Sequence, residues 1–125
     1  LNPNYYQESL EQMTSVGSKL TKKILNLKEP PTAIICSQDK YFIGCLQECQ
    51  KRGLEVPKDI SLVGYNDHDN YLSSQNLTFI SHPLSEMGKM AVEILEKIEN
   101  GVAPKKLSKL IEPILNKGKS DKKIN

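Results

Sequence analysis

The chain has 125 residues, of which 38% are hydrophobic and 26% are charged, and its formal net charge is +2. This length suits one domain, and the composition is ordinary for a soluble globular protein. No apolar run approaches the roughly 20 residues of a membrane-spanning helix, so we expect no membrane partner. The three cysteines form no CxxC pair and the chain has no basic, apolar leader, which favours a cytoplasmic protein. Because the chain begins with Leu1 and not with Met, we expect a fragment of something longer.

A first helix is expected after a polar, irregular start at residues 1–13. Apolar side chains recur at helical spacing from Val16 to Leu27, and the hydroxyl of Thr14 or Ser15 can cap the N-terminus. Pro30–Pro31 then ends the helix, because proline cannot continue it.

A strand and a second helix follow in the sequence. The apolar run Thr32–Cys36 predicts a short strand, and Gln38 or Asp39 can cap a helix that extends to about Arg52. Gly53 stands where a left-handed C-terminal cap is expected.

Two further strands are expected in the middle of the chain. Ile60–Tyr65 is rich in apolar and β-branched residues and predicts a buried strand. The polar loop Asn66–Asn76 separates it from a third strand at Leu77–Ser81.

The last part of the chain predicts a helix and a basic tail. The helix begins at Pro83 and ends at Gly101, and its inward stripe is expected to hold Met87, Ala91, Ile94, Leu95 and Ile98. Leu107–Leu115 predicts one more strand, broken by Pro113, and Gly118–Asn125 is expected to be disordered. We therefore divide the chain into residues 1–104, a partial lobe, and residues 105–125, a crossover strand remnant with a basic, solvated tail.

Strands and helices in this alternating order are typical of an α/β fold, here a small parallel sheet flanked by helices. The predicted core lies between the sheet and the helices and is expected to hold Ile34, Ile35, Leu62, Val63 and Ile80. The carboxyl ends of parallel strands meet at one edge of a sheet, and ligands bind just beyond that edge.

Polar residues follow each of the three predicted strands. Gln38 and Asp39 follow the first strand, Asn66 and Asp67 the second, and His82 the third. Amide and carboxylate groups suit a sugar, because they pair with neighbouring hydroxyls as donor and acceptor. A structural alternative stays open for three of them, since Asp39 and His82 also suit helix caps and Asp67 suits loop ordering.

Four stretches between Pro31 and Gly101 carry a resemblance to a known family. In chain order they are PTAIICSQD, KRGLEVP, KDISLVGYND and LTFISHPLSEMG. With this order and spacing they resemble the effector-binding half of the LacI/GalR family of bacterial transcription regulators. The resemblance implies the C-terminal lobe of a periplasmic-binding-protein-like domain, in which a small ligand, usually a sugar or nucleobase, lies in a cleft between two lobes.

The resemblance also implies which residues meet the effector. Gln38 stands where the family usually has Asn, Asn66 where it usually has Asp, and His82 where it often has Gln. These departures imply an effector, or a distance to it, that differs from ordinary sugar recognition. The run LTFISHPLSEMG is similar to that of arabinose-sensing members, so arabinose is one candidate.

The function implied by the resemblance is effector sensing and dimerisation in a regulator whose DNA-binding N-terminal domain is expected to be missing here. A periplasmic sugar-binding protein of a transporter shares the fold, although the connector GLEVPKDIS is typical of regulators, and a ligand-free interaction domain is a third alternative. The sequence has no GxSxG, P-loop or HExxH motif, so we expect neither an enzyme nor a cofactor. The cysteines with His68 and His82 fit no common zinc-ligand spacing, so we expect no metal.

Overall fold

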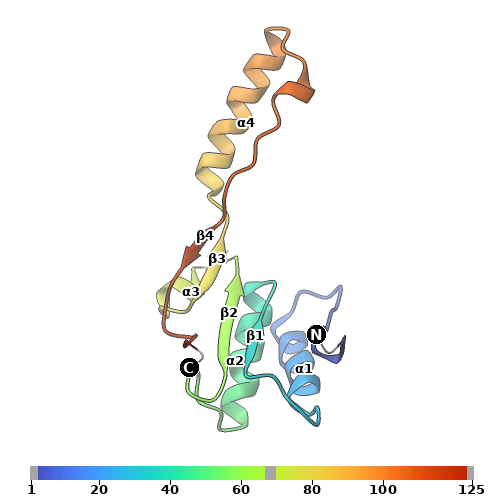
Figure 1. The fold of residues 1–125 in the computed structure, drawn as a ribbon, viewed down its shortest axis with the longest axis vertical. Coiled ribbons are helices and arrows are strands. Elements are labelled where there is room, and N and C mark those ends of the chain that lie inside the picture. The colour runs from blue at the N-terminus through green and yellow to red at the C-terminus, as the bar shows by residue number, and fades with distance from the viewer. Residues whose placement is uncertain (1–2, 67–69, 124–125) are drawn as a thin grey trace. The chain divides into compact units, whose positions relative to one another are not determined.

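The computed structural model describes residues 3–66 and 70–123 (Figure 1). Its helices are α1 (Thr14–Leu25), α2 (Asp39–Lys51), α3 (Tyr71–Ser74) and α4 (Leu84–Glu99), with short 3-10 turns η1 (Pro3–Tyr5) and η2 (Pro104–Lys106). Its strands are β1 (Ala33–Ile35), β2 (Ser61–Tyr65), β3 (Phe79–Ser81) and β4 (Ile114–Asn116).

The chain forms two compact units. The first unit consists of Leu1–Ile80 together with Leu115–Asn125, and the second consists of Ser81–Ile114. The first unit holds α1, α2 and most of the sheet, whereas α4 belongs to the second. The division at residues 104 and 105 that we expected from composition remains a prediction.

The strands lie in the order β1-β2-β3-β4, which follows the order of the sequence. Strand β2 is parallel to β1, with Ile35 opposite Val63, and parallel to β3, with Tyr65 opposite Ile80. The predicted fold class, a small parallel sheet flanked by helices, is therefore confirmed.

The core lies between α2 and one face of the sheet. Leu62 of β2 is fully buried there, and Phe42, Cys45 and Cys49 of α2 are buried against it. Leu72 of α3 also joins this cluster, although the sequence predicts only a polar loop between β2 and β3. Leu72, with Tyr71 also packed against the core, therefore anchors a short helix within that polar stretch.

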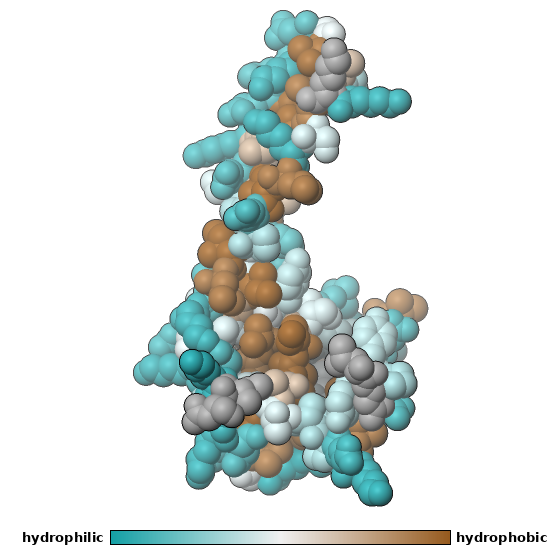
Figure 2. All heavy atoms as spheres, viewed as in Figure 1, coloured by the Kyte–Doolittle hydropathy of each residue, from teal (hydrophilic) through white to brown (hydrophobic). Residues whose placement is uncertain are grey.

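The predicted core is wrong for the opposite face of the sheet. Ile35 is 75% exposed, and Val63 and Ile80 are half-buried. Ile34, opposite Leu62, is half-buried against the core cluster, as predicted. The register explains the difference, because Ile35 and Val63 are neighbours on the face turned away from α2. Figure 2 shows apolar side chains gathered over the strands of this unit.

Helices α1 and α2 cross closely where two glycines meet. A Cβ atom on Gly17 would lie 2.7 Å from the backbone of Tyr41, and one on Gly44 would lie 2.6 Å from the backbone nitrogen of Ser18. Real Cβ atoms do not approach a backbone so closely, so both positions need glycine in this packing.

The expected side-chain caps of α1 and α2 are not formed. Met13 is the N-cap of α1 and Gln38 is the N-cap of α2, and neither side chain makes a capping hydrogen bond. At the other end of α2, Gly53 has φ +71° and confirms the predicted left-handed cap.

No residue of α4 is buried in the second unit, so the predicted inward stripe is wrong in this structure. Leu95 is 61% exposed and Met87 is 41% exposed. This unit, Ser81–Ile114, holds a helix and its return segment, with only one end residue each of β3 and β4. Gly101, with φ +86°, follows the helix as predicted.

The C-terminal segment is ordered as far as the structure describes it, which corrects the disorder expected from Gly118 onward. Ser120 is 1% exposed, and its carbonyl oxygen accepts a hydrogen bond from the N–H of Leu62 at 2.7 Å. The N–H of Lys119 donates to the carbonyl oxygen of Asn76 at 2.7 Å. Backbone hydrogen bonds to β2 and to the connector before β3 thus hold in place a segment whose composition predicts no ordered structure.

Candidate functional site

The parallel register places the carboxyl ends of β1 and β2 at the same edge of the first unit. Ile35 ends β1 and lies opposite Val63, while β2 continues to Tyr65. Gln38 and Asp39 follow β1, and Asn66 follows β2, so this edge carries two amides and a carboxylate. This arrangement is the one in which open α/β folds bind ligands.

Gln38 and Asp39 differ in their surroundings. Gln38 is half-buried, with extended backbone (φ −152°) and a side chain that is not used as a cap. Asp39 is only 7% exposed, and its Oδ1 accepts a hydrogen bond from the N–H of Lys40 at 2.7 Å. This hydrogen bond to the next residue is local, and it is not the helix cap that the alternative interpretation predicts, because the N-cap of α2 is Gln38.

Asn66 lies in the left-handed region, with φ 64°, immediately after β2. Its N–H donates to the carbonyl oxygen of Ile80 at 2.8 Å, which fixes the backbone beside β3. Asparagine tolerates this conformation better than most residues, so a backbone requirement is one reason for its presence. Asp67, the next predicted site residue, lies outside the described residues.

His82 is exposed and belongs to the second unit, where it follows β3. Its carbonyl oxygen accepts a hydrogen bond from the N–H of Leu84 at 2.9 Å, at the start of α4. The role predicted for its side chain remains a prediction.

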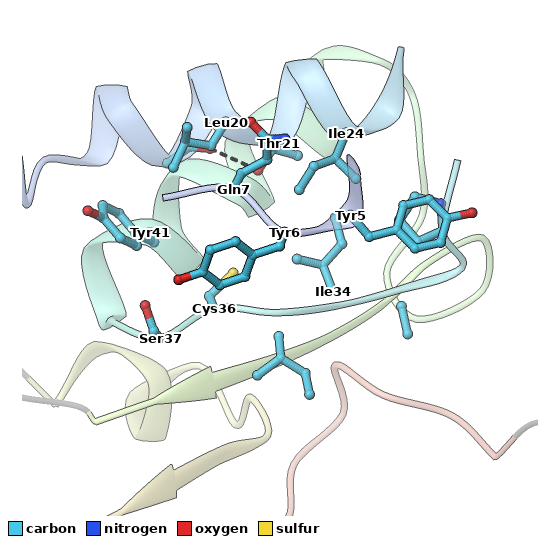
Figure 3. A pocket seen from close by; sticks show the side chains of 14 residues that line it. Tyr5, Tyr6, Gln7, Leu20, Thr21, Ile24, Ile34, Cys36, Ser37 and Tyr41 are labelled. Atoms are coloured by element: carbon cyan, nitrogen blue, oxygen red, sulfur yellow. Dashed lines mark hydrogen bonds between the residues drawn. The ribbon is translucent and has the colours of Figure 1, made fainter. Parts of the chain in front are cut away.

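A cavity of about 370 Å³, which the sequence does not predict, lies beside β1. Figure 3 shows its labelled side chains on three walls, which are the N-terminal segment (residues 3–13), helix α1 and the run from β1 into α2. Those walls are lined by Tyr5, Tyr6, Gln7, Leu20, Thr21, Ile24, Ile34, Cys36, Ser37 and Tyr41, among others. Gln38, Asp39 and Asn66 are not among the lining residues, so this apolar pocket is separate from the polar strand ends. The one feature of the sequence that points to this pocket is the adjacent pair Tyr5–Tyr6 in an otherwise polar N-terminal segment.

Two tyrosine hydroxyls hold the N-terminal segment over this apolar pocket. The hydroxyl of Tyr5 donates to the carbonyl oxygen of Glu29 at 2.8 Å, and that of Tyr41 lies 2.9 Å from the carbonyl oxygens of Ser9 and Glu11. The N-terminal segment, which the sequence predicts to be irregular, is thus hydrogen-bonded near both of its ends to other parts of the first unit.

The described residues contain no group of three or more His, Cys, Asp or Glu side chains that could hold a metal. A hydrogen bond to Cys36, together with burial, raises the pKa of the Cys45 thiol to about 12, and contact with Cys45 and burial raise that of Cys49. Both thiols are therefore protonated at neutral pH and are poor nucleophiles. Among the described helices, none is long and apolar enough to cross a membrane.

Comparison with known proteins defines the class. A model of the periplasmic binding protein-like domain matches residues 2–120. The chain belongs to this family, in agreement with its parallel sheet and flanking helices.

Curated relatives within this class are transcriptional repressors. The repressor CytR of Escherichia coli K12 is 36% identical over 80 residues, which cover 63% of this chain and 24% of that protein. The ribose operon repressor of Haemophilus influenzae is 37% identical over 103 residues, which cover 80% of this chain and 30% of that protein. The chain thus spans less than a third of the length of these relatives.

A solved structure gives the same result. A regulatory protein of the LacI family from Chloroflexus aggregans superimposes with a TM-score of 0.78 and 28% identity, over 90% of this chain and 41% of that one. The resemblance to LacI/GalR regulators is confirmed. These relatives are regulators, which favours this class over a transporter protein, and the ones named here are not enzymes.

Proposed function

We propose that this chain is the effector-sensing lobe of a LacI-type transcriptional repressor. The observation that carries the proposal is its similarity to two repressors over 63% and 80% of its length. The parent protein would contact DNA through a separate N-terminal domain. It would act in the cytoplasm, where free thiols such as those of Cys36, Cys45 and Cys49 are stable.

The effector would bind at the polar edge formed by Gln38, Asp39 and Asn66, with Asp67 and His82 as further contacts. Gln38 and Asn66 carry both donors and acceptors, which a hydroxylated ligand uses fully. Asp39, the residue after Gln38, supplies a carboxylate. Among sugars, a pentose such as ribose or arabinose is the first candidate, because one relative is named for the ribose operon.

The repressor would be a homodimer. Exposed apolar side chains support this proposal, since Leu84, Val92 and Leu95 on α4 are each more than half exposed. Apolar patches of this kind mark association surfaces on soluble proteins. Light scattering at micromolar concentration tests it, and a monomer across the whole concentration range would contradict it.

Calorimetry of the intact repressor with ribose and arabinose tests the site. Gln38→Ala and Asn66→Gly should each weaken binding, because each removes hydrogen bonds of about 0.5–1.5 kcal/mol net. Glycine is the better replacement at Asn66, since alanine would add strain at φ 64°. Ser108→Ala, at an exposed position, is the control. Unchanged affinity in both site variants would place the effector elsewhere.

A further inference from the structure

The pocket beside β1 has the size of a ligand site but a different chemistry from the polar strand ends. Its volume of about 370 Å³ falls within the range of about 300–1,000 Å³ that small-molecule sites occupy. Leu20, Ile24 and Ile34 line its inner side, and the ring of Tyr6 forms part of its outer wall (Figure 3). Tyr6 is 72% exposed, so the pocket can be reached from solvent.

Five of the polar side chains on its walls donate hydrogen bonds within the chain. The hydroxyl of Thr21 donates to the carbonyl oxygen of Gly17 at 2.8 Å, and those of Tyr5 and Tyr41 donate to backbone carbonyls. The hydroxyl of Tyr6 donates to Glu8, and Nε2 of Gln7 donates to the carbonyl oxygen of Asn4. What the walls offer to a ligand is therefore mainly carbon surface.

Among the described residues, no Asp, Glu, Lys or Arg side chain lines the pocket. A charged ligand would lose its hydration without gaining an ion pair, and a sugar would lose hydrogen bonds to water for few in return. An uncharged ring with an apolar face gives up few hydrogen bonds to water. It gains contact with three tyrosine rings and with the aliphatic side chains. Empty apolar cavities bind such rings in other proteins.

We propose that the pocket between the N-terminal segment, α1 and β1 is a second ligand site, which takes a small, uncharged, aromatic ring compound. The site is independent of the effector edge, because Gln38, Asp39 and Asn66 do not line it. Its outer wall is the N-terminal segment, held by the hydrogen bonds of Tyr5 and Tyr41. Occupancy would add contacts between that segment and α1 and so hold the segment in place.

Indole is a suitable probe, and nitrogen-15 NMR of the 125-residue chain is the measurement. Indole should cause saturable shifts at the amides of Leu20, Thr21, Ile24 and Ile34. Leu20→Trp should fill the pocket with a larger ring and weaken indole binding at least tenfold. Leu10→Trp is the matched control, since Leu10 is fully exposed and does not line the pocket, and it should bind indole as the parent chain does.

A second measurement uses the unmodified chain, in case Leu20→Trp fails to fold. Cys36 lines the pocket, so indole should slow the alkylation of its thiol by a small reagent at least threefold. Arabinose at the same concentration should have no effect. The proposal is overturned if indole shifts fail to saturate, if both tryptophan variants bind equally, if Cys36 is not protected, or if arabinose occupies the pocket instead.

Discussion

The hydroxyl of Ser120 donates a hydrogen bond to the carbonyl oxygen of Leu62 at 2.7 Å, although 58 positions separate them in sequence. The same hydroxyl oxygen accepts the N–H of Thr78 at 2.8 Å. One side chain near the C-terminus therefore joins β2 to the residue before β3. The segment that composition predicts to be disordered is thus part of the sheet's support.

Ser120→Ala should destabilise the chain by about 1–3 kcal/mol, because the buried N–H of Thr78 and the carbonyl of Leu62 lose this partner. Urea denaturation monitored by circular dichroism measures the loss. The exposed Ser108, changed to Ala, should leave the midpoint in place. Equal stability of the two variants would show that the C-terminal segment does not support the sheet in solution.

Acid should weaken the contact between α1 and α2. Glu48 accepts hydrogen bonds from Nε of Arg52 at 2.9 Å and from Ser18 at 3.0 Å. The Arg52 hydrogen bond, partly opposed by burial, lowers the pKa of Glu48 below its ordinary value of 4.5. A carboxyl with a lowered pKa in the folded state gives stability that is present above the unfolded pKa and is lost as pH falls through the folded value.

Stability measured by urea denaturation from pH 7 to pH 2.5 should therefore fall below about pH 4.5, and Glu48→Gln should flatten that fall. Asp121, whose pKa is lowered mainly by Lys117 and also by Thr78, contributes in the same direction. The exposed Glu93, changed to Gln, is the control. A pH profile of Glu48→Gln parallel to that of the parent chain would contradict the role of this pair.

The period of the apolar residues predicted the first three strands and the long helices to within a few residues, because helical and strand spacing are local properties. The strand expected at Leu107–Leu115 is instead the short strand Ile114–Asn116. The period could not tell which face of the sheet is covered, since that depends on where distant helices pack. Ile35 and Leu62 look alike in sequence, yet one is 75% exposed and the other fully buried. The apolar pocket was missed for a similar reason, because its walls come from segments brought together only by folding.

Leu62→Ala should therefore cost about 2–5 kcal/mol, as for other fully buried leucines, while Ile35→Ala should cost much less. Thermal and urea denaturation of both variants measures the difference. If Ile35→Ala were as damaging as Leu62→Ala, the outer face of the sheet would be covered in solution.

The three thiols should differ in reactivity. The raised pKa values of Cys45, at about 12, and of Cys49 leave almost no thiolate at pH 8. Both side chains are also fully buried, whereas Cys36 lines the apolar pocket. Alkylation followed by mass spectrometry of peptides should find Cys36 modified first, and all three modified together only after unfolding. Rapid native labelling of Cys45 or Cys49 would contradict the packing of α2.

Two glycine substitutions should have opposite effects. At Gly44 an added Cβ atom would meet the carbonyl oxygen of Thr14 and the backbone nitrogen of Ser18, and backbone atoms cannot move aside cheaply. Gly44→Ala should therefore destabilise the chain strongly or prevent folding, even though alanine favours a helix by about 1 kcal/mol.

At Gly88, inside α4, the same Cβ would meet nothing within 4 Å among the described residues, so Gly88→Ala should stabilise the helix. Circular dichroism during thermal denaturation measures both variants. A stable Gly44→Ala variant would show that α1 and α2 do not cross at this pair, and a destabilised Gly88→Ala variant would show that another surface packs on α4 at that position.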